Sequence, residues 1–439
     1  MPRRFPVVPL SCYLKIWHLP EKPGHSLVYS TRTAGLLILG DEFISNLTAD
    51  NIPTEHREAL IQAGVIVENQ ELERQAVSTM LAEINHLTTA FRASMILTLD
   101  CNFACRYCYE GSMKSKTAMT EATAEQCISF FKDRFNTRGK STLILDLYGG
   151  EPLLVLNRIR QLAAALKPYV EEKDGRFEMH MVTNGSLLNP NTLRELVGLG
   201  LATIKVTLDG PPENHNQFRP FKNGQPSFER IVTNLKECLG IVPIILNGNY
   251  TRENYPSYPA LLDLLFDQGF TTSDFQHVSF QPVMQTSDKF TLPGFSCGYK
   301  SMKEEWLPPA AVFTRDAIIS HGFPVATLSP DVCMVDVEDG CVVHYNGTIY
   351  KCTTMAGHAG YEAGDVWQGI RDFSEKYLAG DLRKLEEQCR ECVYLPLCFG
   401  GCRYMRYQET GSMAGIDCQK LFFDAALESI IRQDARAYL

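Results

Sequence analysis

The sequence predicts an α/β protein built around an open, partial (β/α)6 barrel of the TIM kind. A small N-terminal α+β module with a winged-helix-like pattern precedes the barrel, and a cysteine-rich region follows it. Two observations predict this architecture. Segments of strand and helix character alternate between residues 93 and 290, and repeated βα units form a parallel sheet. Each polar or glycine-rich motif of this stretch also follows a predicted strand, where such barrels carry their chemistry.

The composition is that of an ordinary globular protein. The chain has 439 residues, of which 45% are hydrophobic and 21% charged, and it is long enough for about two or three domains. Its net charge of −9 argues against general nucleic-acid binding. The apolar run at residues 5–10 is too short for a signal peptide, and no stretch approaches the ~20 apolar residues of a membrane span. We expect a cytoplasmic protein with neither nucleic acid nor a membrane as partner.

Residues 1–70 are predicted to form the winged-helix-like module, and residues 71–92 a charged helical connector. Short apolar runs between turn residues predict the strands, and Pro53 and Gly64 bound a helix. The expected strands are Tyr13–His18, Ser26–Ser30, Leu36–Leu39 and a returning strand at Val65–Val67.

Residues 93–290 are predicted to form the barrel. The expected strands are Met95–Leu99, Leu143–Tyr148, Glu178–Thr183, Thr203–Leu208, Val242–Asn247 and His277–Pro282. The expected helices are Thr120–Arg138, Arg158–Val170, Asn191–Leu199, Phe228–Leu239 and Tyr258–Gln268. A bridging region at 291–330, a second cysteine region at 331–420 and a C-terminal helix at 421–439 complete the chain.

The first predicted barrel strand leads into three closely spaced cysteines, Cys101, Cys105 and Cys108. Thiolate cages usually supply four ligands to a cubane [4Fe–4S] cluster, so three leave one iron open to a small molecule. A zinc site would want four ligands, yet this segment has one C-x2-C pair and no histidine close by. A disulfide framework belongs to small secreted chains, and clustered cysteines in a cytosolic protein are better explained as metal ligands or catalytic residues.

This C-x3-C-x2-C spacing resembles that of the radical SAM enzymes. In that family the open iron chelates S-adenosylmethionine (SAM), and the product is a 5′-deoxyadenosyl radical. Gly149-Gly150-Glu151-Pro152, one βα unit later, is similar to the family segment whose backbone binds the methionyl amino group. Glycines there let the backbone approach a ligand closely.

Further cofactor contacts follow from the same resemblance. Tyr107 is expected beside the adenine, and Asn184 lies in a segment similar to the Thr-Asn-Gly of the family. Thr207 and Arg219 are expected to bind the methionyl carboxylate, because a hydroxyl and a guanidinium both suit a carboxylate. Thr207 stands where the family usually has serine. We expect His215, between them, to be structural.

The second cysteine region resembles the SPASM domain, which holds two further [4Fe–4S] clusters. The resemblance therefore implies three clusters in all, together with SAM. For the inner auxiliary cluster, Cys341 is the nearest candidate for a fourth ligand and Cys297 the next, and an open position is the other alternative. Zinc ribbons are the competing interpretation. The implied ligands are Cys333, Cys352 and Cys402 for the inner cluster, and Cys389, Cys392, Cys398 and Cys418 for the outer cluster.

Radical SAM proteins with this extension mostly modify peptides or proteins. We therefore expect an oxidoreductase that abstracts hydrogen from a ribosomally synthesised precursor peptide and installs a thioether or carbon–carbon crosslink, an epimerisation or an oxidation. Residues 11–70 resemble modules that capture a leader peptide as an added strand. The segment Leu10–Ile16 resembles maturases of the geopeptide type. A flavodoxin or ferredoxin is the expected reductant.

Two other functions fit parts of the pattern. The first is an anaerobic sulfatase-maturing enzyme that makes formylglycine. In such enzymes an aspartate follows the cysteine that matches Cys352 and acts as the base, whereas this chain has Thr353 and Thr354. Asp336, Glu338 and Asp339 lie nearby as substitutes, so the general base is unknown. The second is a non-catalytic Fe–S scaffold that binds peptides, which would not cleave SAM.

Overall fold

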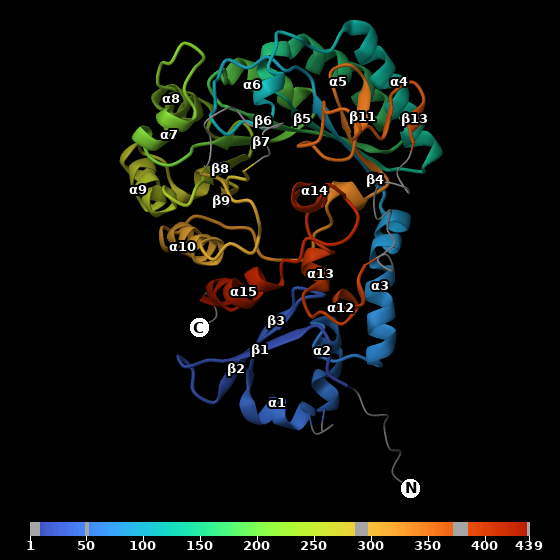
Figure 1. Cartoon of the computed structure of the whole chain (residues 1–439), viewed down its shortest axis with the longest axis vertical. Coiled ribbons are helices and arrows are strands. Elements are labelled where there is room, and N and C mark those ends of the chain that lie inside the picture. The colour runs from blue at the N-terminus through green and yellow to red at the C-terminus, as the bar shows by residue number, and fades with distance from the viewer. Residues whose placement is uncertain (1–8, 49–51, 286–296, 372–384, 437–439) are drawn as a thin grey trace. The chain divides into compact units, whose positions relative to one another are not determined.

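The computed structural model describes residues 9–48, 52–285, 297–371 and 385–436 (Figure 1). The chain divides into two compact units, each assembled from segments that are distant in sequence. The terminal unit comprises Met1–His86, Thr327–Asp336 and Leu378–Leu439, and the barrel unit comprises Leu87–Ala326 and Val337–Tyr377. The predicted cysteine region is thus shared between the units. None of the described helices has the length and apolar character needed to cross a membrane.

The barrel unit is built on one ten-stranded sheet, ordered β13-β12-β11-β10-β4-β5-β6-β7-β8-β9. Strands β4 to β9 are parallel neighbours, as the sequence predicts (Figure 1). They span Ala90–Ile96, Thr142–Tyr148, Arg176–Thr183, Leu201–Thr207, Ile244–Tyr250 and His277–Pro282. The helices of this unit are α4 (Glu121–Thr137), α5 (Leu156–Glu171), α6 (Pro190–Gly198), α7 (Pro212–Phe218), α8 (Phe228–Cys238), α9 (Tyr258–Asp267) and α10 (Leu307–Ser320).

Alternating side chains give the barrel strands two different faces. In β5, Leu143, Leu145 and Leu147 are fully buried, while the residues between them are only partly buried. Because successive strand residues point to opposite faces, the leucines face the helices, and Asp146 and Tyr148 face the barrel interior. The barrel interior is therefore lined by polar as well as apolar side chains, as a binding site requires.

The structure corrects one predicted strand of the barrel unit and adds elements that were not predicted. The first barrel strand begins at Ala90 rather than Met95, because Phe91, Ala93 and Met95 are buried on one face while Arg92 pairs with Asp146 on the other. Helix α7 was not predicted. The region after residue 337 adds β10 (Gly340–Val343) parallel to β4, and β11 (Thr348–Tyr350), β12 (Gly364–Asp365) and β13 (Gly369–Ile370) follow antiparallel.

The terminal unit contains a three-stranded antiparallel sheet, β1-β2-β3, close to the predicted one. Its strands are apolar on both faces because both are covered. Val28, Leu37 and Leu39 pack with α1 and α2, whereas Leu27 and Tyr29 pack with the C-terminal helix α15. The elements are β1 (Leu14–His18), β2 (His25–Ser30), β3 (Leu36–Gly40), α1 (Asp41–Thr48), α2 (Arg57–Gln62), α3 (Gln70–Leu87), α12 (Glu387–Arg390), α13 (Leu395–Cys398), α14 (Arg403–Thr410) and α15 (Lys420–Ala435).

Two predictions for this unit are wrong. The expected returning strand at Val65–Val67 is not a strand, since Ile66 forms only an isolated bridge with Leu10. Its apolar residues instead fill the core beneath β2. Helix α1, which begins directly after β3, was not predicted. The predicted connector is a helix, α3, but it ends at Leu87.

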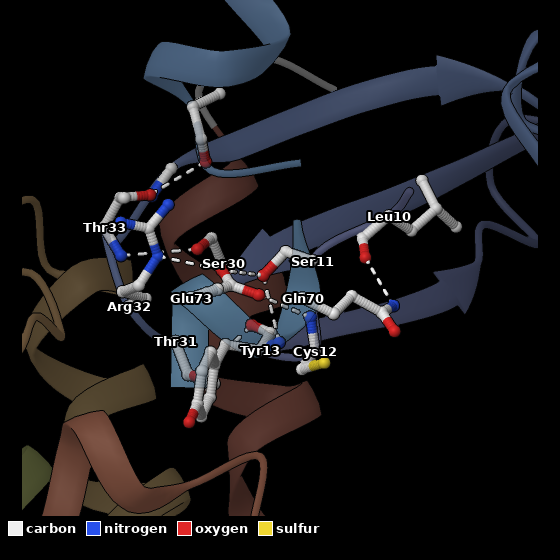
Figure 2. Close-up of polar contacts among 12 residues, drawn as sticks. Leu10, Ser11, Cys12, Tyr13, Ser30, Thr31, Arg32, Thr33, Gln70 and Glu73 are labelled. Carbon is white, nitrogen blue, oxygen red and sulfur yellow. Dashed lines mark hydrogen bonds and ion pairs between the residues drawn. The ribbon is translucent and has the colours of Figure 1, made fainter. Parts of the chain in front are cut away.

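One buried carboxylate anchors the start of this module to α3 (Figure 2). The Glu73 side chain is 3% exposed. It accepts hydrogen bonds from Ser11 Oγ at 2.6 Å, the Cys12 backbone N–H at 2.8 Å and Arg32 Nε at 3.0 Å. Such charge-assisted bonds are stronger than neutral ones, and a buried charge needs this compensation. Glu73 therefore holds the segment that enters β1 and the turn after β2 against one helix.

Replacing Glu73 with alanine is expected to destabilise this unit by about 2–4 kcal/mol, because one buried and two partly buried donors lose their acceptor together. Hydrogen exchange of residues 10–16 and the thermal transition measure the loss. Glu83 is the matched control, since it lies on the exposed face of the same helix, and Glu83→Ala should stay within about 0.5 kcal/mol of wild type. Equal effects of the two substitutions would contradict the anchoring role.

Candidate active site

A cavity of about 380 Å³ lies at the carboxyl ends of the barrel strands. This volume falls within the range of about 300–1,000 Å³ that small-molecule sites occupy. Residues from β5, β6, β7 and β8 line it, together with the loop that follows β4. The predicted site residues in its wall are Cys101, Cys105, Cys108, Tyr107, Gly149, Gly150, Asn184, Thr207 and Arg219.

The cysteine triplet and a lysine share one wall of the cavity. Cys101 and Cys105 are buried, and Cys108 is partly buried. Burial raises the pKa of the Cys101 and Cys108 thiols, and the Lys114 ammonium opposes that rise at both. Lys114 is held in place by a 3.0 Å bond from its Nζ to the Phe103 carbonyl. Its positive charge suits a set of thiolates.

The three thiols fit a cubane cluster better than a single ion. Within the described ranges, no group of three or more His, Cys, Asp or Glu side chains converges closely enough to hold one metal ion. In a cubane each cysteine bonds a different iron, so its ligands stand further apart. When bound, such a cluster would supply the electron that cleaves the sulfonium of SAM. Cys101, Cys105 and Cys108 are the residues that would hold it.

The two glycines after β5 form a backbone cradle. A Cβ atom on Gly149 would lie 2.6 Å from the Thr98 carbonyl oxygen, and its φ of +121° is one that other residues rarely adopt. A Cβ atom on Gly150 would lie 2.1 Å from the Asp100 carbonyl oxygen. Both positions therefore require glycine, and they bring the β5 end against the segment that enters the cysteine triplet.

Glu151 and Pro152 do not line the cavity, although the sequence grouped them with the cofactor contacts. Glu151 is completely buried behind it. Its carboxylate accepts from Thr183 Oγ1 at 2.9 Å, the Asn184 N–H at 2.8 Å and the Leu153 N–H at 3.0 Å. The side chain thus joins the end of β5 to the end of β6, and it positions Asn184 beside the cysteine loop.

Tyr107, Asp209, Arg219 and Asn249 form one buried network. The Tyr107 hydroxyl donates to Asp209 and accepts from Arg219 Nη1 at 2.7 Å and from Asn249 Nδ2 at 3.1 Å. Asp209 is completely buried, and burial raises the pKa of its carboxyl while Arg219, 3.9 Å away, opposes the rise. The Arg219 Nε is buried without a hydrogen-bond partner, so this guanidinium retains a donor. The expected role of Tyr107 beside the adenine stays a prediction.

His215 has the structural role expected for it. It is fully buried, its Nδ1 accepts from the Asp209 N–H at 3.1 Å, and its Nε2 lies 3.0 Å from Ser227 Oγ. Burial holds the pKa of this imidazole well below its usual value, so it stays neutral. His215 therefore supports the loop that carries Asp209 and does not face the ligand.

Sequence reasoning missed several residues of the cavity wall. Lys205 lies two residues before Thr207 on β7, so strand alternation alone could have placed it on the same face. Glu110, whose pKa burial raises to about 7, is the one carboxyl among the lining residues. Thr354, which follows Cys352 by two residues, also reaches the cavity. Asn249 was missed because its contact with Asp209, which is buried and does not line the cavity, joins two different strand ends.

The structure places the four expected outer-cluster ligands together. Cys389, Cys392, Cys398 and Cys418 line one small pocket of the terminal unit, with Tyr394 and Lys420 beside them. These cysteines come from α12, α13 and the segment before α15. Convergence of four thiols from separate elements agrees with a shared metal group, and the assignment itself stays a prediction.

The expected inner-cluster ligands are divided between the units. Cys333 and Cys402 are neighbours in the terminal unit, since a negative charge on Cys402 raises the pKa of the Cys333 thiol. Cys352 follows β11 in the barrel unit. Cys341 is completely buried in β10, and the Cys127 thiol of α4 is close enough for a charge on Cys341 to raise its pKa. That is the environment of a core cysteine. Cys297 is partly buried, and none of the contacts described for Cys341 or Cys297 favours either residue as the fourth ligand.

Comparisons with known proteins agree with this site. Residues 95–255 match the model of the radical SAM superfamily. A serine-type anaerobic sulfatase-maturating enzyme of Bacteroides thetaiotaomicron is 22% identical over 352 residues, which is 71% of this chain and 81% of that protein. A PqqA peptide cyclase of Granulibacter bethesdensis is 21% identical over 330 residues, covering 72% and 83%.

Solved structures show the same fold at low sequence identity. The structure of anSMEcpe with bound AdoMet and a Cp18Cys peptide has a TM-score of 0.61 and 19% identity, covering 78% of this chain and 98% of that one. Streptococcus suis SuiB bound to its precursor peptide SuiA has a TM-score of 0.55 and 12% identity, covering 94% and 97%. The chain is an enzyme with a radical SAM domain at residues 95–255, a domain that implies SAM and a [4Fe–4S] cluster, and it shares the fold of these two structures.

Proposed function

We propose that this chain is a maturase that abstracts a hydrogen atom from a ribosomally synthesised precursor peptide and thereby installs a post-translational modification. The observation that carries the proposal is the cavity, which the cysteine triplet, the glycine cradle and the ends of β6 and β7 line together. The choice of a peptide substrate is supported by three similar proteins, a sulfatase-maturating enzyme, a PqqA peptide cyclase and SuiB bound to its precursor peptide.

The three-stranded sheet of the terminal unit supports capture of a leader peptide. In the described part of the chain, β3 (Leu36–Gly40) pairs with β2 alone. An edge strand of this kind presents free N–H and C=O groups on which an extended peptide can add as a further strand. We assign leader recognition to this edge.

The auxiliary sites complete the proposal. We assign Cys389, Cys392, Cys398 and Cys418 to an outer [4Fe–4S] cluster, and Cys333, Cys352 and Cys402 to an inner one, whose fourth ligand is left open between Cys341, Cys297 and none. With the cluster of the triplet this makes three. A cytoplasmic location and a flavodoxin or ferredoxin as reductant are further parts of the proposal.

Formylglycine synthesis is less well supported. Asp339 is fully engaged by Lys140 at 2.7 Å and Arg134 at 3.3 Å, and neither Asp339 nor Glu338 lines the cavity. The residue of this loop that reaches the cavity is Thr354, which cannot act as a carboxylate base. The alternative of a non-catalytic Fe–S scaffold is not supported, because a scaffold would not cleave SAM and the chain has a radical SAM domain.

The anaerobically reconstituted enzyme, reduced and supplied with SAM, is expected to form 5′-deoxyadenosine and to modify a small peptide encoded beside its gene. Mass spectrometry of the peptide identifies the reaction. A loss of two hydrogens indicates a crosslink or an oxidation, and unchanged mass with altered chirality indicates epimerisation.

Two further substrates serve as controls. The same peptide without its N-terminal leader should be modified much more slowly if β3 captures the leader, and equal rates would remove that assignment. A sulfatase-derived peptide should remain unmodified. Its conversion to formylglycine, with the precursor left untouched, would replace the proposed function with the sulfatase alternative.

A further inference from the structure

Lys205 presents a cation inside the cavity. It lies on β7, in register with Val182 of β6 and Ile245 of β8. Thr207, two residues further along, shares its face and pairs with Asn247. Lys205 therefore occupies the layer directly below the hydroxyl that the sequence assigned to a carboxylate, and the cavity reaches both side chains.

The Lys205 ammonium makes no hydrogen bond and no ion pair with the residues that the structure describes. Burial lowers the pKa of this lysine, with the negative charge of Asp146 opposing the change. Asp146 is not its partner, because Arg92 already binds both carboxylate oxygens, at 2.6 and 2.8 Å. Lys205 is partly buried, and a cation that is partly removed from water and has no partner among the described residues favours an acceptor that binds in the cavity.

Arg219, the other cation expected to bind a carboxylate, differs from Lys205 because it contacts polar groups of the protein itself. Its Nη1 donates to the Tyr107 hydroxyl at 2.7 Å and lies 3.9 Å from the buried Asp209 carboxylate. Its charge is therefore partly neutralised within the protein. Lys205 makes no such contact with the described residues, and it lies next to the Thr207 hydroxyl, which can donate a second bond to a ligand.

We propose that Lys205 Nζ forms an ion pair with a carboxylate bound in the cavity, either the methionyl carboxylate of SAM or a carboxylate of the peptide substrate. The first source requires only the cofactor, whereas the second rests on the proposed function. In both cases Lys205 is a binding residue that sets the position of its ligand relative to the cysteine triplet, and it takes no part in electron transfer.

Binding of two ligands to the wild type and to Lys205 variants tests whether the methionyl carboxylate of SAM is the partner of Lys205. The cluster-reconstituted enzyme, without reductant or peptide, is titrated by equilibrium dialysis with SAM and with decarboxylated SAM, which lacks only the carboxylate. Lys205→Met is expected to weaken SAM binding about tenfold or more, and Lys205→Arg to keep most of it. The Lys205→Met variant should bind decarboxylated SAM as the wild type does, because the partner group is absent.

If the partner is a carboxylate of the peptide substrate, the variants are expected to behave differently. SAM binding is then unchanged in Lys205→Met, while the KM for the peptide rises about tenfold and deoxyadenosine forms without peptide modification. Removing the acidic group of the peptide should produce the same change in the wild-type enzyme and no further change in the variant.

Lys236→Met is the matched control, since Lys236 is exposed on α8 and its Nζ bonds only Gln268 at 2.8 Å. It should leave both ligands unaffected, and iron content and the thermal transition check that each variant folds. The proposal is overturned if a folded Lys205→Met enzyme binds SAM and peptide within twofold of wild type. The dialysis contains no peptide, so its result stands even if the proposed substrate class is wrong.

Discussion

Cys105→Ala is expected to abolish the formation of 5′-deoxyadenosine and to lower the iron content by one cubane. Cys105 is 7% exposed and lines the cavity with Cys101 and Cys108. With three protein ligands, the loss of one leaves two bonds to hold the cluster at the cavity wall. Iron and sulfide analysis, the electron paramagnetic resonance spectrum of the reduced protein and deoxyadenosine assay measure the effect.

Cys238 offers the matched control for this substitution. It is completely buried in α8, where it packs as a core residue. Cys238→Ala should lower stability slightly and keep the iron content and the SAM cleavage of the wild type. Normal turnover by the Cys105 variant, or equal loss of iron in both variants, would show that the triplet does not hold the reducing cluster.

Gly150→Ala is expected to eliminate detectable SAM binding. The added methyl group would lie 2.1 Å from the Asp100 carbonyl oxygen and 2.6 Å from its carbon, so backbone must move. That carbonyl accepts the Glu151 N–H at 2.9 Å, and the next residue is Cys101. A shift therefore separates the β5 end from the cysteine loop, and both parts of the cofactor site are displaced together. Equilibrium dialysis with SAM and iron analysis measure the change.

Gly198→Ala provides the comparison for the same chemical change. Gly198 ends helix α6, has no neighbouring atom within 4 Å of an added Cβ and has no positive φ. Alanine there is expected to be neutral or slightly stabilising, since alanine favours helices. If Gly150→Ala bound SAM as tightly as Gly198→Ala does, the cradle would not be part of the cofactor site.

The barrel was largely predictable because its signals are local. The six strands β4 to β9 and most of the helices between them follow from apolar periodicity and turn residues, and the strand ends carry Gly149, Asn184 and Thr207 as expected. The start of β4 was misplaced because Arg92, a polar residue, is satisfied by Asp146 on a neighbouring strand. Local patterns do not reveal such a partner.

The contacts that complete the cavity were not predictable in this way. The Tyr107 hydroxyl meets Asp209 and Asn249 only because three separated segments converge at the strand ends. The extension of the sheet by β10 to β13 depends on pairing between β10 and β4. These two strands are far apart in the sequence, so no local pattern predicts that they pair. The covering of Leu27 and Tyr29 by α15 likewise joins the two ends of the chain.

The amino-acid sequence by itself determined the order of the βα units, the cysteine spacing and the glycines after β5, because each depends on residues adjacent in the chain. Only the tertiary structure decided which side chains share the cavity, and it distinguished Lys205, which has no partner among the described residues, from Arg219, which donates to the Tyr107 hydroxyl. The physical reason is that burial and charge compensation are properties of a site, and a site forms only when distant segments are packed together.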